Sequence, residues 1–171
     1  MSTAHYQYTK VDNKYIIKLM GELKYKWSSG FSNFIKKIFH KGDFDDIIVD
    51  ISEASYIDST NIGLLAQIAR FSLQKFSHKL PVIVDTDGLQ ELLRDMGFAE
   101  ICEFVKMPDN FDYEYKSIQS TQGSKENLGK MILDAHKTLT EINENNKQQF
   151  KDVVNLLEKQ TGKEKDKDET E

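Results

Sequence analysis

The chain is poor in cysteine, in proline and in long apolar runs. Cys102 is the single cysteine in 171 residues, so no disulfide framework can form within the chain. The longest nearly apolar stretches, such as residues 62–69, fall far short of the ~18 residues that a membrane-spanning helix needs. Residues 1–5 lack a basic region followed by an apolar core, so we expect no signal peptide and a cytoplasmic globular protein.

Basic charge and ligand clusters are also scarce. The 23 Lys and Arg residues are outnumbered by 28 Asp and Glu residues, which argues against general affinity for nucleic acid. The histidines lack the spacing of metal ligands, so we expect them on the surface and predict no metal site; they are His5, His40, His78 and His136. Since the sequence has neither a phosphate-binding Gly-x-x-x-x-Gly-Lys element nor a set of residues for nucleophilic catalysis, we expect no catalytic residue, no cofactor and no enzyme.

Short aromatic and β-branched segments predict the strands. Residues 6–9 and 15–20 flank Asp12-Asn13-Lys14, a turn sequence typical of a β-hairpin. Residues 46–51, 81–85 and 101–105 predict three further strands.

Apolar residues at steps of three and four predict helices between these strands. The helices cover residues 29–41, 59–77 and 87–96, with Gly42 and Gly97 at two of their ends. The predicted order β-β-α-β-α-β-α-β indicates an α/β fold with a mixed, mostly parallel sheet of about five strands. We place this domain at residues 1–106.

The remaining residues have a different character. Residues 107–123 predict a connector, residues 124–160 one long amphipathic helix with a heptad-like seam, and residues 161–171 a disordered charged tail. The seam consists of Leu128, Ile132, Ala135, Leu139, Ile142, Val153 and Leu156, and passes polar Asn146. Such a helix could pack on its own domain, self-associate as a coiled coil or bind a partner helix, and the sequence leaves these alternatives open.

Side chains with hydroxyl and carboxylate groups stand where a predicted strand is followed by the longest helix. Asp58, Ser59 and Thr60 are all good N-capping residues, and from the spacing alone a cap is the simpler interpretation. A hydroxyl in the first helical turn is also a suitable phosphate acceptor, because unpaired N–H groups and the helix dipole favour an anion there.

The strand-and-helix order and two phrases of the sequence resemble the STAS domain of bacterial anti-sigma-factor antagonists. The phrases are Val49-Asp50-Ile51-Ser52 and Tyr56-Ile57-Asp58-Ser59-Thr60-Asn61-Ile62-Gly63. The resemblance covers roughly residues 5–106 and not the C-terminal helix. Asn61 departs from the small residues common at its position in the family, which puts the identity of the partner in doubt.

The resemblance implies a binding protein controlled by phosphorylation. Family members bind an anti-sigma factor, often also a serine kinase, and the kinase phosphorylates the serine that matches Ser59, with Thr60 as the next acceptor. A PP2C-type phosphatase restores the binding-competent form. The implied partner-binding surface consists of Asp58, Ser59, Thr60, Asn61, Ile62 and Gly63. The alternative is a constitutive STAS scaffold or oligomerisation module in which Ser59 only caps the helix.

Overall fold

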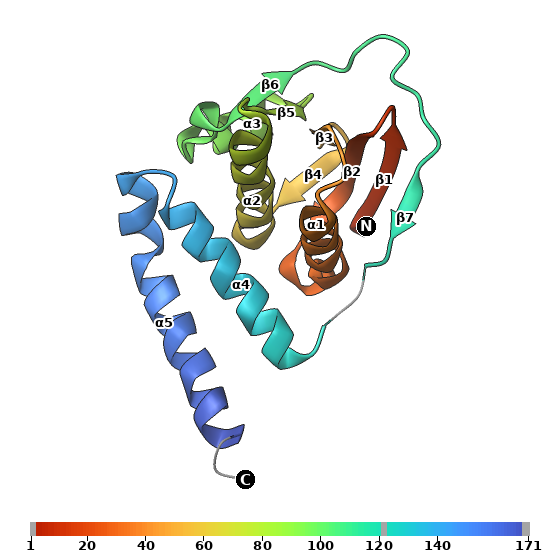
Figure 1. Cartoon of the computed structure of the whole chain (residues 1–171). Helices are drawn as coiled ribbons and strands as arrows, with labels where there is room; N and C mark the ends of the chain where they lie inside the picture. The colour runs from red at the N-terminus through yellow and green to blue at the C-terminus, as the bar shows by residue number, and fades with distance from the viewer. Residues whose placement is uncertain (1–2, 121–122, 169–171) are drawn as a thin grey trace.

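The sheet is built outward from a long central hairpin (Figure 1). The computed structural model describes residues 3–120 and 123–168. Strands β1 (His5–Val11) and β2 (Lys14–Leu23) pair antiparallel, as predicted. Asp12 and Asn13 both have positive φ, at 51° and 62°, which is the backbone that a two-residue hairpin of type I′ requires.

Parallel strands extend the sheet from β2. Strand β3 (Asp46–Asp50) pairs with β2, β5 (Leu80–Ile83) with β3, and β6 (Cys102–Val105) with β5. On the other side, β1 pairs antiparallel with β7 (Lys116–Ile118), so the sheet is mixed. The strand order is β6-β5-β3-β2-β1-β7, and β4 pairs with β2 off this path.

Two short strands were not predicted from the sequence. The expectation of about five strands in the order β-β-α-β-α-β-α-β is wrong, because the described residues form seven. Strand β4 (Ala54–Ile57) pairs with the end of β2, with a shift of register between Gly21 and Glu22. Strand β7 lies inside the predicted connector. Strands of four and three residues carry too few side chains to show a period, and both depend on a distant partner strand.

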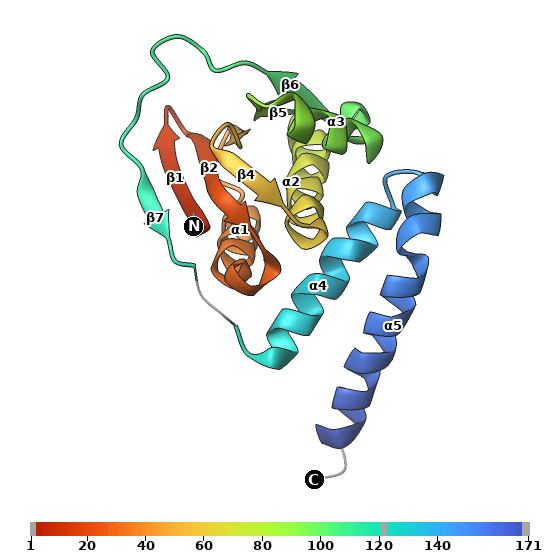
Figure 2. The ribbon, with the colours of Figure 1, turned by 180° about the vertical axis from the view of Figure 1, so that it is seen from behind.

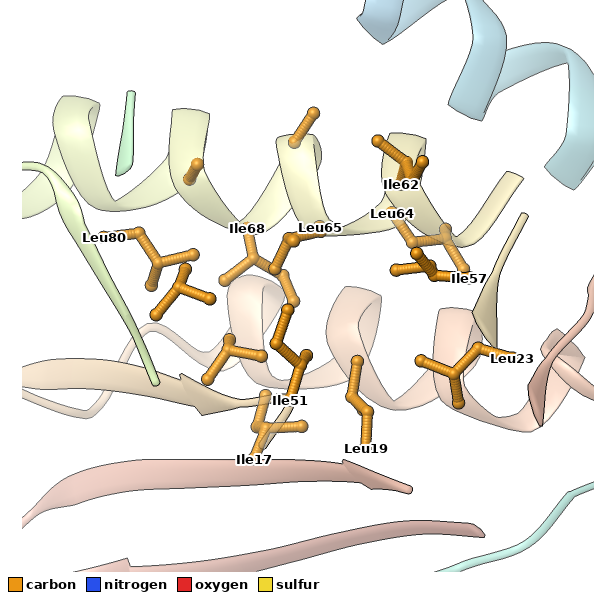
Figure 3. Close-up of a cluster of buried hydrophobic side chains, with 14 of the residues drawn as sticks. Ile17, Leu19, Leu23, Ile51, Ile57, Ile62, Leu64, Leu65, Ile68 and Leu80 are labelled. Atoms are coloured by element: carbon orange, nitrogen blue, oxygen red, sulfur yellow. The ribbon is translucent and has the colours of Figure 1, made fainter. Parts of the chain in front are cut away.

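Helices α1 (Ser29–Lys41), α2 (Ser59–Phe76) and α3 (Asp87–Asp95) occupy the predicted positions. Short 3-10 turns at Tyr25–Trp27 and Phe98–Glu100 precede α1 and follow α3. Figures 1 and 2 show α1 and α2 on the same face of the sheet. The core lies between this face and the two helices (Figure 3) and includes the buried residues Ile17, Leu19, Leu23, Ile51, Ile57, Leu64, Leu65, Ile68 and Leu80.

The C-terminal part is a helical hairpin and not one helix. Helix α4 (Lys125–Thr140) is followed by α5 (Glu144–Asp168), so the prediction of a continuous helix over 124–160 is wrong. Asn143 interrupts it, because its side chain accepts a hydrogen bond from the Asn146 N–H at 2.8 Å, as an N-cap does.

The helix also continues beyond the predicted end. Residues 161–168 of the expected disordered tail are helical, and Lys and Glu are good helix formers; residues 169–171 lie outside the described part. Helix α4 lies between the α/β core and α5 in both views of the ribbon (Figures 1 and 2).

Candidate functional site at the first turn of α2

Asp58 links β4 to α2. Its backbone is extended, with φ −84° and ψ 170°, and its Oδ1 accepts hydrogen bonds from the N–H and the side-chain amide of Asn61, both at 2.9 Å. Its Oδ2 accepts from the Tyr25 N–H at 2.6 Å. Asp58 is therefore the N-cap of α2, and Ser59 is left free of that role.

Asn61 lies at the centre of a buried polar cluster. Its side-chain oxygen accepts from the hydroxyls of Tyr6 at 3.0 Å and Ser28 at 2.9 Å, and the residue is 0% exposed. Tyr6 comes from β1, Ser28 from the start of α1 and Asn61 from α2, so the cluster joins three elements. Burial raises the pKa of Tyr6 to about 12, so its phenol remains a donor at neutral pH.

Ser59 contacts a histidine from the C-terminal hairpin. The Ser59 Oγ lies 2.9 Å from the Nε2 of His136 on α4, and the Nδ1 of His136 lies 2.7 Å from the carbonyl oxygen of Ile132. A carbonyl oxygen can only accept, so Nδ1 carries a proton. In the tautomer whose single proton is on Nδ1, Nε2 accepts a hydrogen bond from the Ser59 hydroxyl.

Helix α4 lies very close to α2 at Gly63. A Cβ atom placed on Gly63 would lie 2.7 Å from the Cβ of Ala135 and would also overlap its carbonyl oxygen. Contacts this short do not occur in relaxed structures, so glycine is required for α4 to sit where it does. Ala135 is 0% exposed, and the two helices are packed backbone against backbone at this point.

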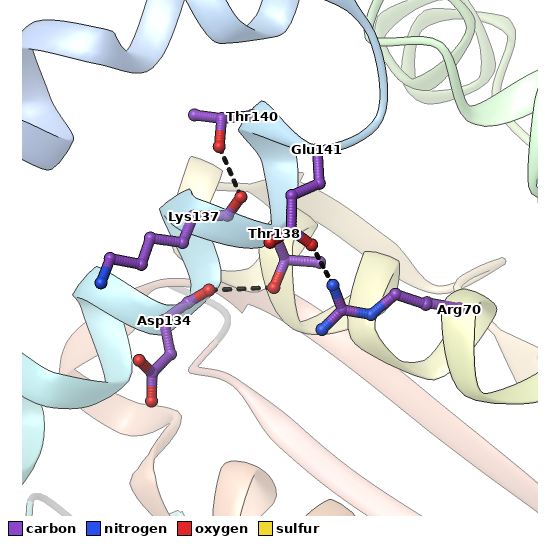
Figure 4. A network of polar contacts seen from close by, with 6 residues as sticks. All are labelled: Arg70, Asp134, Lys137, Thr138, Thr140 and Glu141. Atoms are coloured by element: carbon purple, nitrogen blue, oxygen red, sulfur yellow. Dashed lines mark hydrogen bonds and ion pairs between the residues drawn. The ribbon is translucent and has the colours of Figure 1, made fainter.

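Contacts at both sides of α4 hold it in place. Arg70 on α2 forms an ion pair with Glu141 just after α4 (Figure 4). The Asn146 side chain, 1% exposed, donates to the Met96 carbonyl oxygen at 2.9 Å, so the polar position in the predicted seam docks the hairpin on the end of α3. On α5, Phe150 packs edge-on against the His136 ring at 5.7 Å between centroids.

An open cavity of about 520 Å³ lies beside Ser59. Its lining residues are Lys24, Tyr25, Lys26, Tyr56, Asp58, Ser59, Thr60, Ile132 and His136. Two lysines and the start of α2 favour an anion in this cavity, the Asp58 carboxylate opposes one, and α4 supplies one wall through Ile132 and His136.

The residues predicted to form the partner-binding surface differ in their exposure. Asp58 and Ser59 are half-buried, whereas Thr60, Asn61 and Ile62 are at most 3% exposed and Gly63 is covered by Ala135. As the chain is folded here, residues 60–63 do not form an accessible surface.

His136 is the residue of the site that the sequence did not indicate. The expectation that all four histidines lie on the surface is wrong for His136, which is 5% exposed, while the other three are not buried. Its contact with Ser59 joins residues 77 positions apart, a distance over which no local spacing gives a signal.

The predicted seam is divided between the two helices. The residues on α4 and the turn face the core or α5, with Ala135 and Leu139 at 0% exposure and Leu128, Ile132 and Ile142 half-buried against the core. On α5, Val153 and Leu156 are 40% and 58% exposed. Among the three alternatives left open by the sequence, packing on the domain itself is therefore found for α4.

Membrane spans and metal clusters are both missing from the described part of the chain. Within residues 3–120 and 123–168, no helix is long and apolar enough to cross a membrane. The same residues contain no group of three or more His, Cys, Asp or Glu side chains placed to hold a metal ion.

Comparison with known proteins shows the fold. The sequence matches no protein-family model and no curated protein. The chain is similar to the solved structure of the anti-sigma factor antagonist SpoIIAA in its unphosphorylated form, with a TM-score of 0.51 and 18% identity, over 61% of this chain and 90% of that chain. The Bacillus cell fate determinant SpoIIAA in the phosphorylated form aligns with a TM-score of 0.49 and 19% identity, over 59% and 91% of the two chains. The chain thus has the STAS fold of SpoIIAA and a C-terminal extension.

Proposed function

On the basis of this fold and of the position of Ser59, we propose that the chain is a protein-binding regulator switched by phosphorylation. It acts as an anti-sigma-factor antagonist: with Ser59 unphosphorylated, it binds an anti-sigma factor or a related regulator, which can itself be the serine kinase. The kinase transfers the γ-phosphoryl group of ATP to the Ser59 Oγ, which loses its proton, and ADP leaves. A PP2C-type phosphatase hydrolyses the phosphate ester and restores binding.

The observation that carries this proposal is the place of Ser59 in a STAS fold. It is the first residue of α2, it is half-buried beside an open cavity, and it does not serve as the helix cap. Thr60, the alternative acceptor, is 3% exposed, which supports Ser59 over Thr60. The proposal assigns no catalytic role to any residue.

A phosphate on Ser59 would act through charge and bulk. It adds about −1.5 to −2 charges at neutral pH at a helix start, where an anion is tolerated. The core need not unfold, and the effect falls on whatever contacts this face.

The test combines a phosphorylation assay with a pull-down in which the full-length variants Ser59→Ala and Ser59→Asp are the baits. Incubation of the wild-type chain with extract of its own cells and ATP, followed by mass spectrometry, should place a phosphate on Ser59. The Ser59→Ala variant should remain unmodified, and Thr60→Val, which removes only the neighbouring hydroxyl, should still be phosphorylated. A partner retained by Ser59→Ala and lost with Ser59→Asp supports the switch; equal phosphorylation of Ser59→Ala, or normal binding by Ser59→Asp, refutes it.

The scaffold alternative is favoured by one observation, the exposed apolar side chains of α5. Val153 and Leu156 are 40% and 58% exposed on a helix whose other positions are mostly charged or amide residues. A self-associating module would form oligomers that Leu156→Lys dissociates, measured by sedimentation equilibrium. Gln160→Lys makes a comparable change at an exposed position of the same helix and should leave the mass unchanged.

A further inference from the structure

We infer that α4 is an intramolecular competitor for the Ser59 face of α2, so that a protein partner can bind this face only after α4 has left it. The inference concerns the regulation of the proposed binding site and rests on the proposed function. The Ser59 face is defined here as the side of α2 that carries Ser59, Gly63 and Arg70, the three residues that meet the C-terminal hairpin.

The first argument is that α4 and the residue after it contact the face at three points along α2. Ser59, Gly63 and Arg70 are separated by four and seven residues, so they lie on one side of the helix. Each meets a different residue of the hairpin: His136, Ala135 and Glu141. The contact at Gly63 is so close that no second chain can share it with α4. Occupation by α4 and by a partner are therefore mutually exclusive.

The second argument concerns the hydroxyl group. The Ser59 Oγ is hydrogen-bonded to Nε2 of His136 at 2.9 Å, and the imidazole is held by the Ile132 carbonyl on one side and Phe150 on the other. A kinase must bring the γ-phosphorus of ATP to the same oxygen. While His136 is docked, its ring blocks the direction along which Oγ makes its hydrogen bond. ATP can then approach Oγ only from the side of the cavity.

The third argument is that the centre of the core does not depend on α4. The side chains labelled in Figure 3 all belong to the α/β domain, and the hairpin adds Met131 and Leu139 of α4 and Phe150 of α5 to the buried cluster. The hairpin is attached to it partly by small and polar contacts, of which the ion pair between Arg70 and Glu141 is about half-exposed on both partners. Such contacts can be exchanged for equivalent contacts with another protein.

The geometry also defines what fits in place of α4. The partner element is a helix, with a small residue at the closest approach to Gly63 and a hydrogen-bond acceptor one position further along to receive the Ser59 proton. Ala135 and His136 meet these two requirements in the closed chain.

The test measures access to position 59 in the full chain. Ser59→Cys introduces a thiol at the site, and its labelling by N-ethylmaleimide is followed by mass spectrometry. Cys102 gives no background, because it is 2% exposed. We expect the introduced thiol to react at least tenfold faster when Ala135→Leu is added, since the larger side chain cannot lie against Gly63. Lys130→Leu places the same side chain at an exposed position of α4 and should leave the rate unchanged.

A second variant protects the test against misfolding. If Ala135→Leu disrupts the core, Cys102 becomes labelled as well, and Glu141→Lys then takes its place. That change sets a lysine against Arg70 and should accelerate labelling of the thiol at position 59 severalfold with Cys102 still unreactive. Equal labelling rates, within twofold, in the parent chain and in both hairpin variants would overturn the inference.

A second measurement separates this inference from the proposed function. With Ser59 intact, the phosphorylated fraction after incubation with cell extract and ATP should be higher in Ala135→Leu than in the wild type. If thiol labelling at position 59 responds to the hairpin variants but Ser59 is never phosphorylated and no partner binds, the proposed function fails while α4 still covers the face. If Ser59 is phosphorylated equally in wild type and variants, the function stands and the competition by α4 is refuted.

Discussion

Asn61 explains how a single buried amide can fix the geometry of the site. In the sequence it stood out only as a departure from the small residues common in the family that the chain resembles, in a stretch expected to form a binding surface. In the folded chain it is fully buried and joins Asp58, Tyr6 and Ser28 through hydrogen bonds. Its role is to hold the start of α2 against β1 and α1, which orients Ser59 beside it.

We expect Tyr6→Phe to lower the free energy of unfolding by about 0.5–1.5 kcal/mol. The change removes the hydroxyl that donates to the Asn61 side chain at 3.0 Å, and a net intramolecular hydrogen bond contributes about 0.5–1.5 kcal/mol. Tyr56→Phe deletes the same group from a tyrosine that is 49% exposed and should change stability by less than about 0.5 kcal/mol. Urea unfolding of both variants checks this; equal effects would contradict the buried cluster.

The Cys102 thiol should be unreactive in the native protein. Burial raises the pKa of its thiol to about 12, and the thiolate is the reactive form. At pH 8 we expect no reaction with a disulfide reagent over the time in which the urea-unfolded chain reacts completely. Fast native labelling would show that the last strands open readily.

The same thiol makes stability fall at alkaline pH. The unfolded thiol has a pKa of about 8.5 and the folded one a pKa of about 12, so between these values the unfolded chain releases a proton that the folded chain retains. The contribution of this group to stability is therefore complete below about pH 8.5 and decreases above it. Cys102→Ala should give a shallower loss of the free energy of unfolding between about pH 8 and pH 10; identical slopes would contradict the raised pKa.

At the scale of the elements, the packing of α2 on α4 depends on one glycine. We expect Gly63→Ala to destabilise the full chain by about 1–3 kcal/mol through overpacking, although alanine favours the helix itself, because the new Cβ would lie 2.7 Å from that of Ala135. Hydrogen exchange should show increased opening of α4 while the sheet stays protected.

Gly129 provides the matched control in the hairpin. It lies within α4, and a Cβ added there meets no atom within 4 Å. Gly129→Ala should therefore stabilise the chain by about 0.5–1 kcal/mol. Urea unfolding should give stability changes of opposite sign for the two glycine-to-alanine substitutions. If Gly63→Ala stabilised the chain, the close approach of α4 to Gly63 would be excluded.

Elements with a clear period were predictable, and elements defined by a distant partner were not. Helices α1 to α3 follow the spacing of their apolar residues, and the first hairpin follows its Asp-Asn turn. Strands β4 and β7 form only because β2 and β1 offer free edges. The break between α4 and α5 was hidden because the heptad register of the seam resumes at Val153 after the polar positions Asn146 and Gln149.

Only the α2 part of the candidate site could be predicted from the sequence. The strand-to-helix junction with Asp58 and Ser59 could be found from residue types and local order. The sequence did not predict the burial of Thr60 and Gly63 or the contact of His136 with Ser59. These features depend on how distant elements pack, and the pattern of an amphipathic helix does not indicate which surface the helix covers.

At the scale of the whole molecule, the chain consists of an α/β core and a hairpin that covers part of it. We expect a chain ending at Gly123 to remain folded, because the core residues labelled in Figure 3 all precede that point. It should unfold at lower urea concentration and bind more of an apolar dye than the full chain, since the loss of α4 uncovers the Ser59 face.

Circular dichroism and dye fluorescence of the two chains measure both effects. A shortened chain with the spectrum of a random coil would show that the hairpin is required for folding. A shortened chain with unchanged stability would show that α4 contributes nothing by its packing.

The pairing of β1 with β7 has a consequence for synthesis on the ribosome. Tyr6 pairs with Ile118, so the outer side of the first strand has no neighbour until roughly a hundred further residues have been added. At about 5–20 residues per second, that edge stays open for roughly 5 to 20 s. Exposed strand edges are sites of aggregation, and the newborn chain is therefore most vulnerable at its first strand and for most of the time that its translation takes.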